Sequence, residues 1–332
     1  MGARPIAISR RAWLATTLAL SAAIHPARAE TALRLGILQF GTVQWVADVI
    51  RRHRLDAAHQ VLLETVTLAN TDAGRVALMA GSADVVVSDW LFAATERASG
   101  TPLSFAPFST ATGGIMVRGD SPLHGLSDLQ GRALGVAGGP VDKSWLLVRA
   151  AATAQGVDLS GKARIAYGAP PLLSAKLLQG ELDAVLTFWN FAARLEAANC
   201  RELVSVRACA EALGLTPALG LVGYVFRQDW AERNRTAIDG FLTAAAEADR
   251  LLARSDDEWT AIRPLMDAPD DRAFATLKER YRGAIPQTSA AEEEKTIARV
   301  FEILLRVGGT SATAGLERLP SGMFWPVPDA RT

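Results

Sequence analysis

The stretch Leu78–Trp90, LMAGSADVVVSDW, predicts the end of a helix, a glycine turn and a short strand. Its run of valines shows no polar alternation, which is typical of a strand covered on both faces of its sheet. About a hundred residues later the pattern returns in Leu177–Trp189, LLQGELDAVLTFW. Leucine, glycine, aspartate, valine and tryptophan recur at an offset of 99 or 100. The chain therefore uses one structural unit twice.

The same unit extends outward from both stretches. Leu35-Gly36-Ile37 recurs at offset 99 as Leu134-Gly135-Val136, and Trp45 and Trp145 are 100 residues apart. Strands alternate with helices, which predicts an α/β fold with parallel sheets. The expected strands are Leu33–Leu38, Val61–Leu68, Asp84–Ser88, Arg132–Ala137, Arg164–Tyr167 and Asp183–Thr187; the expected helices are Thr42–His53, Ala73–Ala80, Lys143–Gln155 and Pro171–Gln179.

Two connections between the copies are expected. The glycine-containing stretch Pro107–Asp120 leads from one copy to the other, and Pro217–Phe226 leads back. This predicts a first lobe of residues 30–112 plus 222–332 and a second lobe of residues 113–221. Beyond Asp229 the chain is mostly helical, and its apolar stripes should pack on the first lobe. These stripes lie in Ile238–Leu252, Asp271–Arg282 and Ala291–Leu305.

Residues 1–29 have the pattern of a secretory signal peptide. Arginines precede the apolar run Trp13–Ile24, which is too short to span a hydrocarbon core of about 30 Å. Ala27-Arg28-Ala29 supplies the small residues of a cleavage site. The segment Ser9–Leu14 contains Arg10-Arg11 and resembles a twin-arginine signal; an ordinary secretory signal is the alternative. We expect export to the periplasm, cleavage near Ala29 and no lipid anchor.

The composition of the remaining 303 residues excludes some classes of function. The signal holds four arginines and no acidic residue, which leaves 31 basic and 35 acidic side chains. Nucleic-acid binding needs clustered positive charge, so no nucleic-acid partner is expected. No other segment has about 18 uninterrupted apolar residues, so we expect no membrane span in the mature chain. A soluble monomer is the expectation.

Cys200 and Cys209 lie close together in a chain bound for an oxidising compartment. Two interpretations fit: a disulfide closing a short loop, or two buried free thiols. No histidine lies near them, so they do not indicate a zinc site.

The expected ligand site lies beyond the carboxyl ends of the parallel strands, where helices begin with unpaired N–H groups. Aromatic side chains gather in these loops, and aromatic walls with a few polar groups suit a small planar or partly apolar ligand. The candidate ligand-binding residues are Phe40, Gln44, Trp45, Ser88, Asp89, Trp90, Ser109, Thr110, Gly139, Asp142, Lys143, Thr187, Trp189, Asn190 and Tyr224.

Several of these positions also have a purely structural interpretation. Trp45 can pack under its own helix, and Trp145 fits the core as well as a pocket. Asp142 stands at a helix start, where it serves equally well as an N-cap. Asp84 and Asp183 are expected to satisfy local backbone donors rather than to contact a ligand.

Catalytic motifs are missing. The segment Gly138–Ser144 resembles a phosphate loop, but Asp142 stands where a glycine must precede the lysine. There is no Gly-x-Ser-x-Gly elbow and no His-Glu-x-x-His motif. The histidines of the mature chain, His53, His59 and His124, all lie outside the expected cleft loops. We therefore expect no enzyme activity, no cofactor and no bound metal.

Four segments resemble the nitrate/sulfonate/taurine family of solute-binding proteins, which also includes binders of thiamine pyrimidines. They are Asp72–Arg75, Gly81–Trp90, Gly138–Trp145 and Gln179–Val185. The resemblance implies a type II periplasmic-binding fold with two lobes, two crossover strands, a ligand cleft and a closing hinge. It also implies delivery of the ligand to an ABC permease with a cytoplasmic ATPase.

The candidate residues favour two different classes of ligand. Ser88, Ser109, Thr110, Thr187 and Lys143 suit a sulfonate or another anion, whereas Asp89 and Asp142 would oppose one. Carboxylates and aromatic walls instead favour a planar heterocycle or an amine. Two other functions compete with transport: a periplasmic accessory or sensor protein, and an enzyme like the thiamine-pyrimidine synthases. The cysteine-rich motif of those enzymes is absent here.

Overall fold

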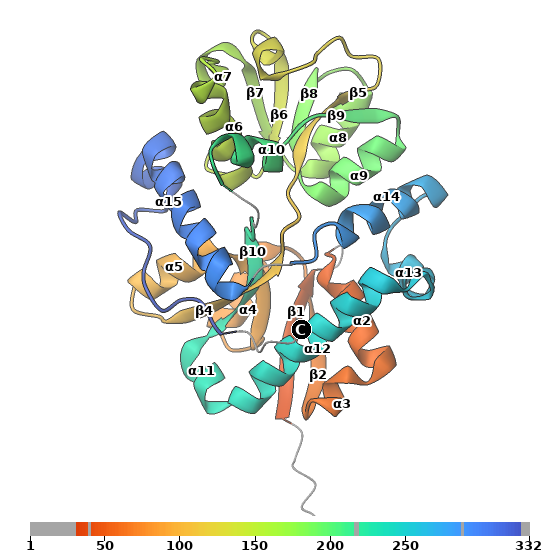
Figure 1. Cartoon of the computed structure of the whole chain (residues 1–332), viewed down its shortest axis with the longest axis vertical. Coiled ribbons are helices and arrows are strands. Elements are labelled where there is room, and N and C mark those ends of the chain that lie inside the picture. The colour runs from red at the N-terminus through yellow and green to blue at the C-terminus, as the bar shows by residue number, and fades with distance from the viewer. Residues whose placement is uncertain (1–30, 39–40, 216–218, 287–288, 327–332) are drawn as a thin grey trace, which may run out of the picture.

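The structure, a computed structural model, describes residues 31–38, 41–215, 219–286 and 289–326. It consists of two α/β lobes stacked along the long axis of the molecule (Figure 1), which confirms the predicted fold class. The predicted signal segment, Phe40 and Pro217 lie outside the described residues. No helix in the described part of the chain is long and apolar enough to cross a membrane.

The first lobe is built on a five-stranded sheet of order β2-β1-β3-β10-β4. Its first three strands are parallel, and β10 runs antiparallel to both of its neighbours. The strands are β1 (Thr31–Leu38), β2 (Val61–Leu68), β3 (Val85–Asp89), β4 (Leu103–Ser109) and β10 (Val222–Arg227). The helices are α2 (Val43–His53), α3 (Leu55–Ala58), α4 (Thr71–Met79), α5 (Trp90–Ala98), α11 (Gln228–Arg233), α12 (Arg235–Arg254) and α13 (Asp256–Ile262).

The second lobe repeats this plan with the order β7-β6-β8-β5-β9. Here β5 is the antiparallel strand between β8 and β9. The strands are β5 (Gly114–Arg118), β6 (Ala133–Ala137), β7 (Arg164–Gly168), β8 (Ala184–Thr187) and β9 (Cys200–Ser205). The helices are α6 (Lys143–Ala154), α7 (Leu159–Lys162), α8 (Pro170–Leu178), α9 (Trp189–Ala197) and α10 (Val206–Ala212).

The repeated sequence produces repeated contacts. Asp84 accepts a hydrogen bond from the backbone N–H of Arg34 at 2.9 Å, and Asp183 accepts one from Ala133 at 2.8 Å. In both copies the N–H of the aspartate returns to the carbonyl of the same partner. These contacts confirm that both aspartates satisfy backbone donors. Gly81 and Gly180 follow the preceding helices with φ of 72° and 78°, which glycine adopts without steric cost.

The chain crosses between the lobes twice, from β4 to β5 and from α10 back to β10. The first crossing is tight at Gly113, where a Cβ would lie 1.8 Å from the carbonyl oxygen of Thr187. Only glycine fits this close approach of two backbones.

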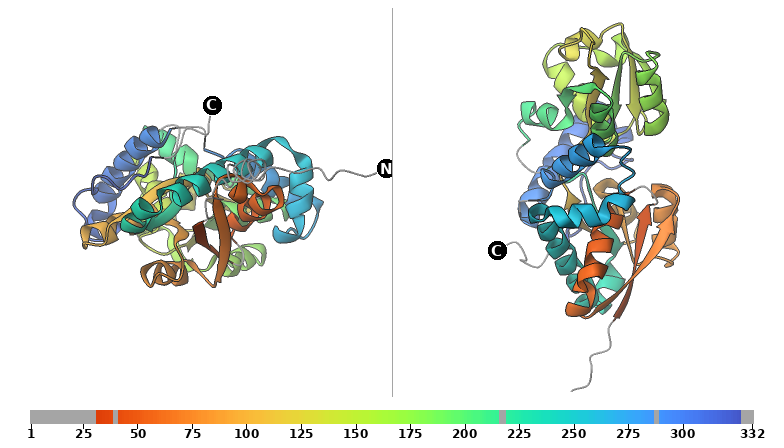
Figure 2. Two further views of the ribbon diagram at one scale, coloured as in Figure 1. Left: turned by 90° about the horizontal axis from the view of Figure 1, so that it is seen from below. Right: turned by 90° about the vertical axis from the view of Figure 1, so that its right-hand side faces the viewer.

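The C-terminal helices extend beyond the first lobe. Helix α12 packs on α2, β1 and β2, as expected. In contrast, α14 (Asp271–Arg282) packs on α9, and α15 (Ala290–Ala312) packs on α6, so both reach the second lobe. Figures 1 and 2 show them alongside the junction of the lobes. An apolar stripe shows that one face of a helix is buried but does not identify the surface that packs against it. For this reason the sequence predicted contacts of α14 and α15 with the first lobe only.

The repeated aspartates lead to a stability prediction. Asp84→Ala removes the acceptor of the Arg34 N–H and also the ion pair of 2.7 Å to the Arg34 side chain. A buried donor without its acceptor costs about 1–3 kcal/mol, so the guanidinium midpoint of unfolding should fall. Asp84→Asn keeps an acceptor oxygen and should lose less. Equal midpoints for the wild type and Asp84→Ala would contradict a structural role.

Candidate functional site

An ion-pair cluster joins the two lobes where strand β3 ends. Asp89 is the last residue of β3 and the N-cap of α5, and it accepts the N–H of Phe92 at 3.0 Å. Its carboxylate lies 2.8 Å from the guanidinium of Arg75 in α4 and 3.2 Å from Nζ of Lys143 in the second lobe. The side chains of Asp89 and Lys143 are each only 16% exposed. Two of the predicted site residues thus meet across the lobe junction.

The charges of this cluster are set by its surroundings. Burial disfavours the charged form of Asp89, but the cations Lys143 and Arg75 outweigh it and hold the pKa of the carboxyl below its usual range. Arg75 also donates from Nε to the hydroxyl of Ser88 at 3.4 Å. The carboxylate of Asp89 therefore lies between two cations, Lys143 and Arg75, and Arg75 also lies 3.5 Å from the exposed carboxylate of Asp72.

Asp142 is the N-cap of α6 and accepts the N–H of Trp145 at 3.1 Å. Burial raises the pKa of its carboxyl above the usual range, against the charge of Lys143 and the backbone donors of the helix. The N-cap interpretation of this residue is correct. The carboxyl group of Asp142 therefore takes up a proton more easily than that of Asp89.

An aromatic cluster forms a second contact between the lobes. Trp189 of the second lobe lies edge-on to Trp45, with ring centroids 6.2 Å apart, and at the same distance from Tyr281 of α14. The side chains of Gln44 and Trp45 both donate to the carbonyl of Leu265. Trp45 is buried, and it packs against Trp189 within this aromatic cluster.

Other candidates serve the fold. Trp90 is fully buried and packs on Phe301 of α15, with centroids 6.3 Å apart. Helix α15 thus covers Trp90 at a position that the sequence left open, while the indole N–H of Trp90 has no hydrogen-bond partner among the described residues. Trp145 is likewise buried in the core. The hydroxyl of Ser109 accepts from the N–H of Ala111, so it is used within the first crossing.

The remaining candidates lie at the crossing or in the second lobe. The side chain of Thr110 donates to the carbonyl of Ala284 at 3.1 Å. Thr187 is buried, and its Oγ1 has no hydrogen-bond partner among the described residues. Gly139 has a positive φ of 91°, in the left-handed region. The backbone carbonyl of Asn190 accepts a hydrogen bond from the side chain of Arg194 at 3.2 Å.

The proposed disulfide is not formed. Cys200 begins β9 and Cys209 lies in α10, and both are buried free thiols. They pack in different hydrophobic clusters, Cys200 with Met116 and Cys209 with Trp145. The short sequence separation therefore does not bring their sulfur atoms together.

Three arginines at the lobe junction carry no sequence signal strong enough to single them out. Arg75 lies in a segment with family resemblance but was given no role. Arg194 of α9 donates to the carbonyls of Met266 and Asp267 at 3.1 and 3.3 Å. Arg280 of α14 donates to Glu196 at 3.0 Å. Inside an amphipathic helix such arginines resemble ordinary solvated residues.

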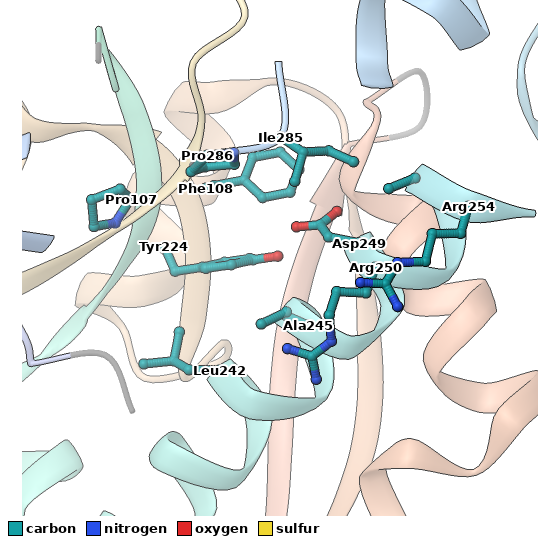
Figure 3. A pocket seen from close by; sticks show the side chains of 12 residues that line it. Pro107, Phe108, Tyr224, Leu242, Ala245, Asp249, Arg250, Arg254, Ile285 and Pro286 are labelled. Carbon is teal, nitrogen blue, oxygen red and sulfur yellow. The ribbon is translucent and has the colours of Figure 1, made fainter. Parts of the chain in front are cut away.

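A hollow of about 290 Å³ lies in the first lobe, between α12, the ends of β4 and β10, and the segment before α15 (Figure 3). Tyr224, which we expected in the cleft, lines this hollow instead. Its neighbours there include Phe108, Asp249 and Pro286.

Two α/β lobes joined by two crossings form the type II periplasmic-binding fold. The family model described as NMT1/THI5 like matches residues 57–257, more than half of the chain. The chain belongs to this family. Among curated protein sequences no significant match is found.

Solved structures of periplasmic binding proteins are similar to most of the chain. The aliphatic sulphonate binding protein SsuA from Escherichia coli has a TM-score of 0.66 and 21% identity, covering 84% of this chain and 94% of its own. The alkanesulfonate-binding protein SsuA from Xanthomonas axonopodis pv. citri, bound to MOPS, has 0.66 and 18%, covering 90% and 99%. The nitrate-binding protein NrtA from Synechocystis PCC 6803 has 0.59 and 14%, covering 86% and 84%.

The free thiols can be tested by alkylation without a reductant. Burial raises the pKa of Cys209 to about 11, and it also raises that of Cys200, so the native protein should resist alkylation at pH 8. After denaturation both cysteines should react, which mass spectrometry would show as two adducts. A denatured protein that takes up no adduct until a reductant is added would establish the disulfide.

Proposed function

We propose that this protein is the solute-binding component of an ABC importer. The signal segment of residues 1–29 directs it to the periplasm, where the mature chain acts as a monomer. It captures a small organic solute between its lobes and delivers it to a membrane permease with a cytoplasmic ATPase. Membership of the NMT1/THI5-like family and the two-lobed fold shared with periplasmic binding proteins support this function.

The solute we propose is an organic anion of the sulfonate type. The contact between Lys143 and Asp89 carries this inference, because it places a buried cation of one lobe against an anion of the other. Asp89 is held by two cations, Lys143 and Arg75, and an acid group that enters the junction competes with Asp89 for them. Charge-assisted hydrogen bonds to such cations are among the strongest that a ligand can form.

The neighbouring side chains suit the apolar part of such a solute. Strands β6 and β8 are adjacent in the sheet, so the loops that follow them lie side by side. These loops carry Val141 and Phe188, which are 50% and 40% exposed, and Phe188 is followed by Trp189. Exposed apolar side chains beside a cation favour an alkyl or aryl sulfonate over a small inorganic anion.

Solute exchange requires the lobes to rotate about the two crossings. The contacts of Arg194 and Arg280 hold the second lobe against residues 266–280, so they are the contacts that opening must break. Their polar character makes them reversible in water, because each group recovers hydrogen bonds with solvent.

The function as a whole is tested by native mass spectrometry of the protein purified from its own periplasm, followed by a thermal-shift screen. The panel contains alkyl and aryl sulfonates, nitrate, amines, pyrimidines and aromatic acids. We expect a co-purifying solute, or a rise in melting temperature with a sulfonate at micromolar concentration. Neither a bound mass nor a shift with any compound would favour the periplasmic accessory or sensor protein instead.

The sign of the charge on the solute is tested by Asp89→Asn. Asparagine caps a helix as well as aspartate does, so α5 should be kept while the competing charge is lost. We expect sulfonates to bind about tenfold more tightly to this variant by calorimetry, corresponding to about 1.4 kcal/mol.

The matched variant Lys143→Met should weaken sulfonate binding about tenfold or more, since a hydrogen bond to a charged group contributes about 1.5–3 kcal/mol. An amine solute would respond in the opposite way to both variants. Weaker binding to Asp89→Asn together with unchanged binding to Lys143→Met would contradict the proposed anion.

A further inference from the structure

The hollow in the first lobe is separate from the lobe junction. Helix α12 covers the face of the sheet on which Tyr224 and Phe108 lie, whereas Arg75 of the ion-pair cluster comes from α4. Helix α4 packs on the opposite face, against Leu68 and Val86. A molecule in the hollow therefore occupies a different site from a solute held between the lobes.

The inner wall of the hollow is apolar and aromatic. The ring of Tyr224 lies 5.1 Å from that of Phe108 and 5.0 Å from that of Phe241, measured between centroids. Leu242, Ile285 and two prolines complete this wall. The volume of about 290 Å³ lies just below the usual range for ligand pockets, about 300–1,000 Å³. A compact, flat, apolar body fits these walls.

A buried donor points into this space. Tyr224 is 3% exposed, and its hydroxyl has no hydrogen-bond partner among the described residues. Burial, with the charge of Asp249, raises its pKa well above the ordinary value, so the hydroxyl keeps its proton and remains a donor. A buried donor without an acceptor costs about 1–3 kcal/mol. A ligand that brings an acceptor to this point recovers that free energy.

The charges around the hollow specify what kind of acceptor fits. Figure 3 shows the carboxylate of Asp249 facing the hydroxyl of Tyr224. Asp249 already accepts the hydroxyl of Tyr281 at 2.7 Å. Its negative charge disfavours an anionic acceptor beside Tyr224, whereas a ligand hydroxyl can accept from Tyr224 and donate toward the carboxylate. Arg250 and Arg254 of α12 also line the hollow, and Arg254 is exposed to solvent.

We propose that the hollow is a second binding site, which takes a small aromatic acid bearing a hydroxyl group. The ligand hydroxyl lies between Tyr224 and Asp249, its ring lies against Phe108, and its carboxylate lies toward Arg250 and Arg254.

The probe is 4-hydroxybenzoate, titrated into the full mature chain by calorimetry and compared with benzoate and 4-hydroxybenzyl alcohol. We expect 4-hydroxybenzoate to bind more tightly than benzoate, which lacks the hydroxyl group, and more tightly than 4-hydroxybenzyl alcohol, which lacks the carboxylate. Tyr224→Phe should weaken 4-hydroxybenzoate about three- to tenfold, to the level of benzoate, and leave benzoate unchanged. Arg254→Gln should weaken both acids and leave the alcohol unchanged.

Two further variants locate the site. Ala245→Leu fills the hollow and should abolish binding of 4-hydroxybenzoate, whereas Val76→Ser, at an exposed position of α4 on the opposite face of the sheet, should leave it unchanged. Melting curves show whether each variant is folded, and Tyr224→Phe should melt no lower than the wild type because it removes an unmatched polar group. No measurable heat with the wild type at millimolar ligand would overturn the proposal. So would unchanged affinity in Tyr224→Phe, or unchanged binding in Ala245→Leu.

Discussion

The sheet of the first lobe cannot be completed by one continuous segment of chain. Strand β10 lies between β3 and β4 and hydrogen-bonds to both, yet it follows the entire second lobe in sequence. In the second lobe β5 lies between β8 and β9 but precedes both of them. Each lobe therefore depends on a strand that is continuous with a crossing. This constraint keeps the two lobes adjacent while leaving two short connections about which they can rotate.

The site follows from the same constraint. Because the two copies face each other across the crossings, the end of β3 meets the start of α6, and Asp89 reaches Lys143. In this arrangement Asp89 balances a cation of the opposite lobe, and the N-cap bond to Phe92 holds it in place. In the proposed function, an incoming acid group would take the place of Asp89 beside Lys143 and Arg75. Asp89, which the sequence suggested would oppose an anion, would then compete with the solute for the same cations.

The repeat in the sequence predicted much of the fold. The matched aspartates, glycines and apolar strands are determined by local backbone needs, so residues such as Asp84 and Asp183 could be interpreted from spacing alone. The helices that pack against α14 and α15 could not be predicted, because the apolar stripe of an amphipathic helix does not specify which surface covers it. For this reason Trp90 was placed in the cleft, although α15 buries it. The role of Arg75 was missed because its partners, Ser88 and Asp89, are brought to it only by the fold.

The central claim is that a solute closes two lobes that rotate about the crossings. It is tested most directly by the distance between spin labels at Glu64 and Gln155, exposed positions on the two lobes, in a variant with both natural cysteines replaced by serine. The account predicts a broad distance distribution without solute and a single, shorter distance with the solute identified in the screen. The same distribution with and without saturating solute would contradict it.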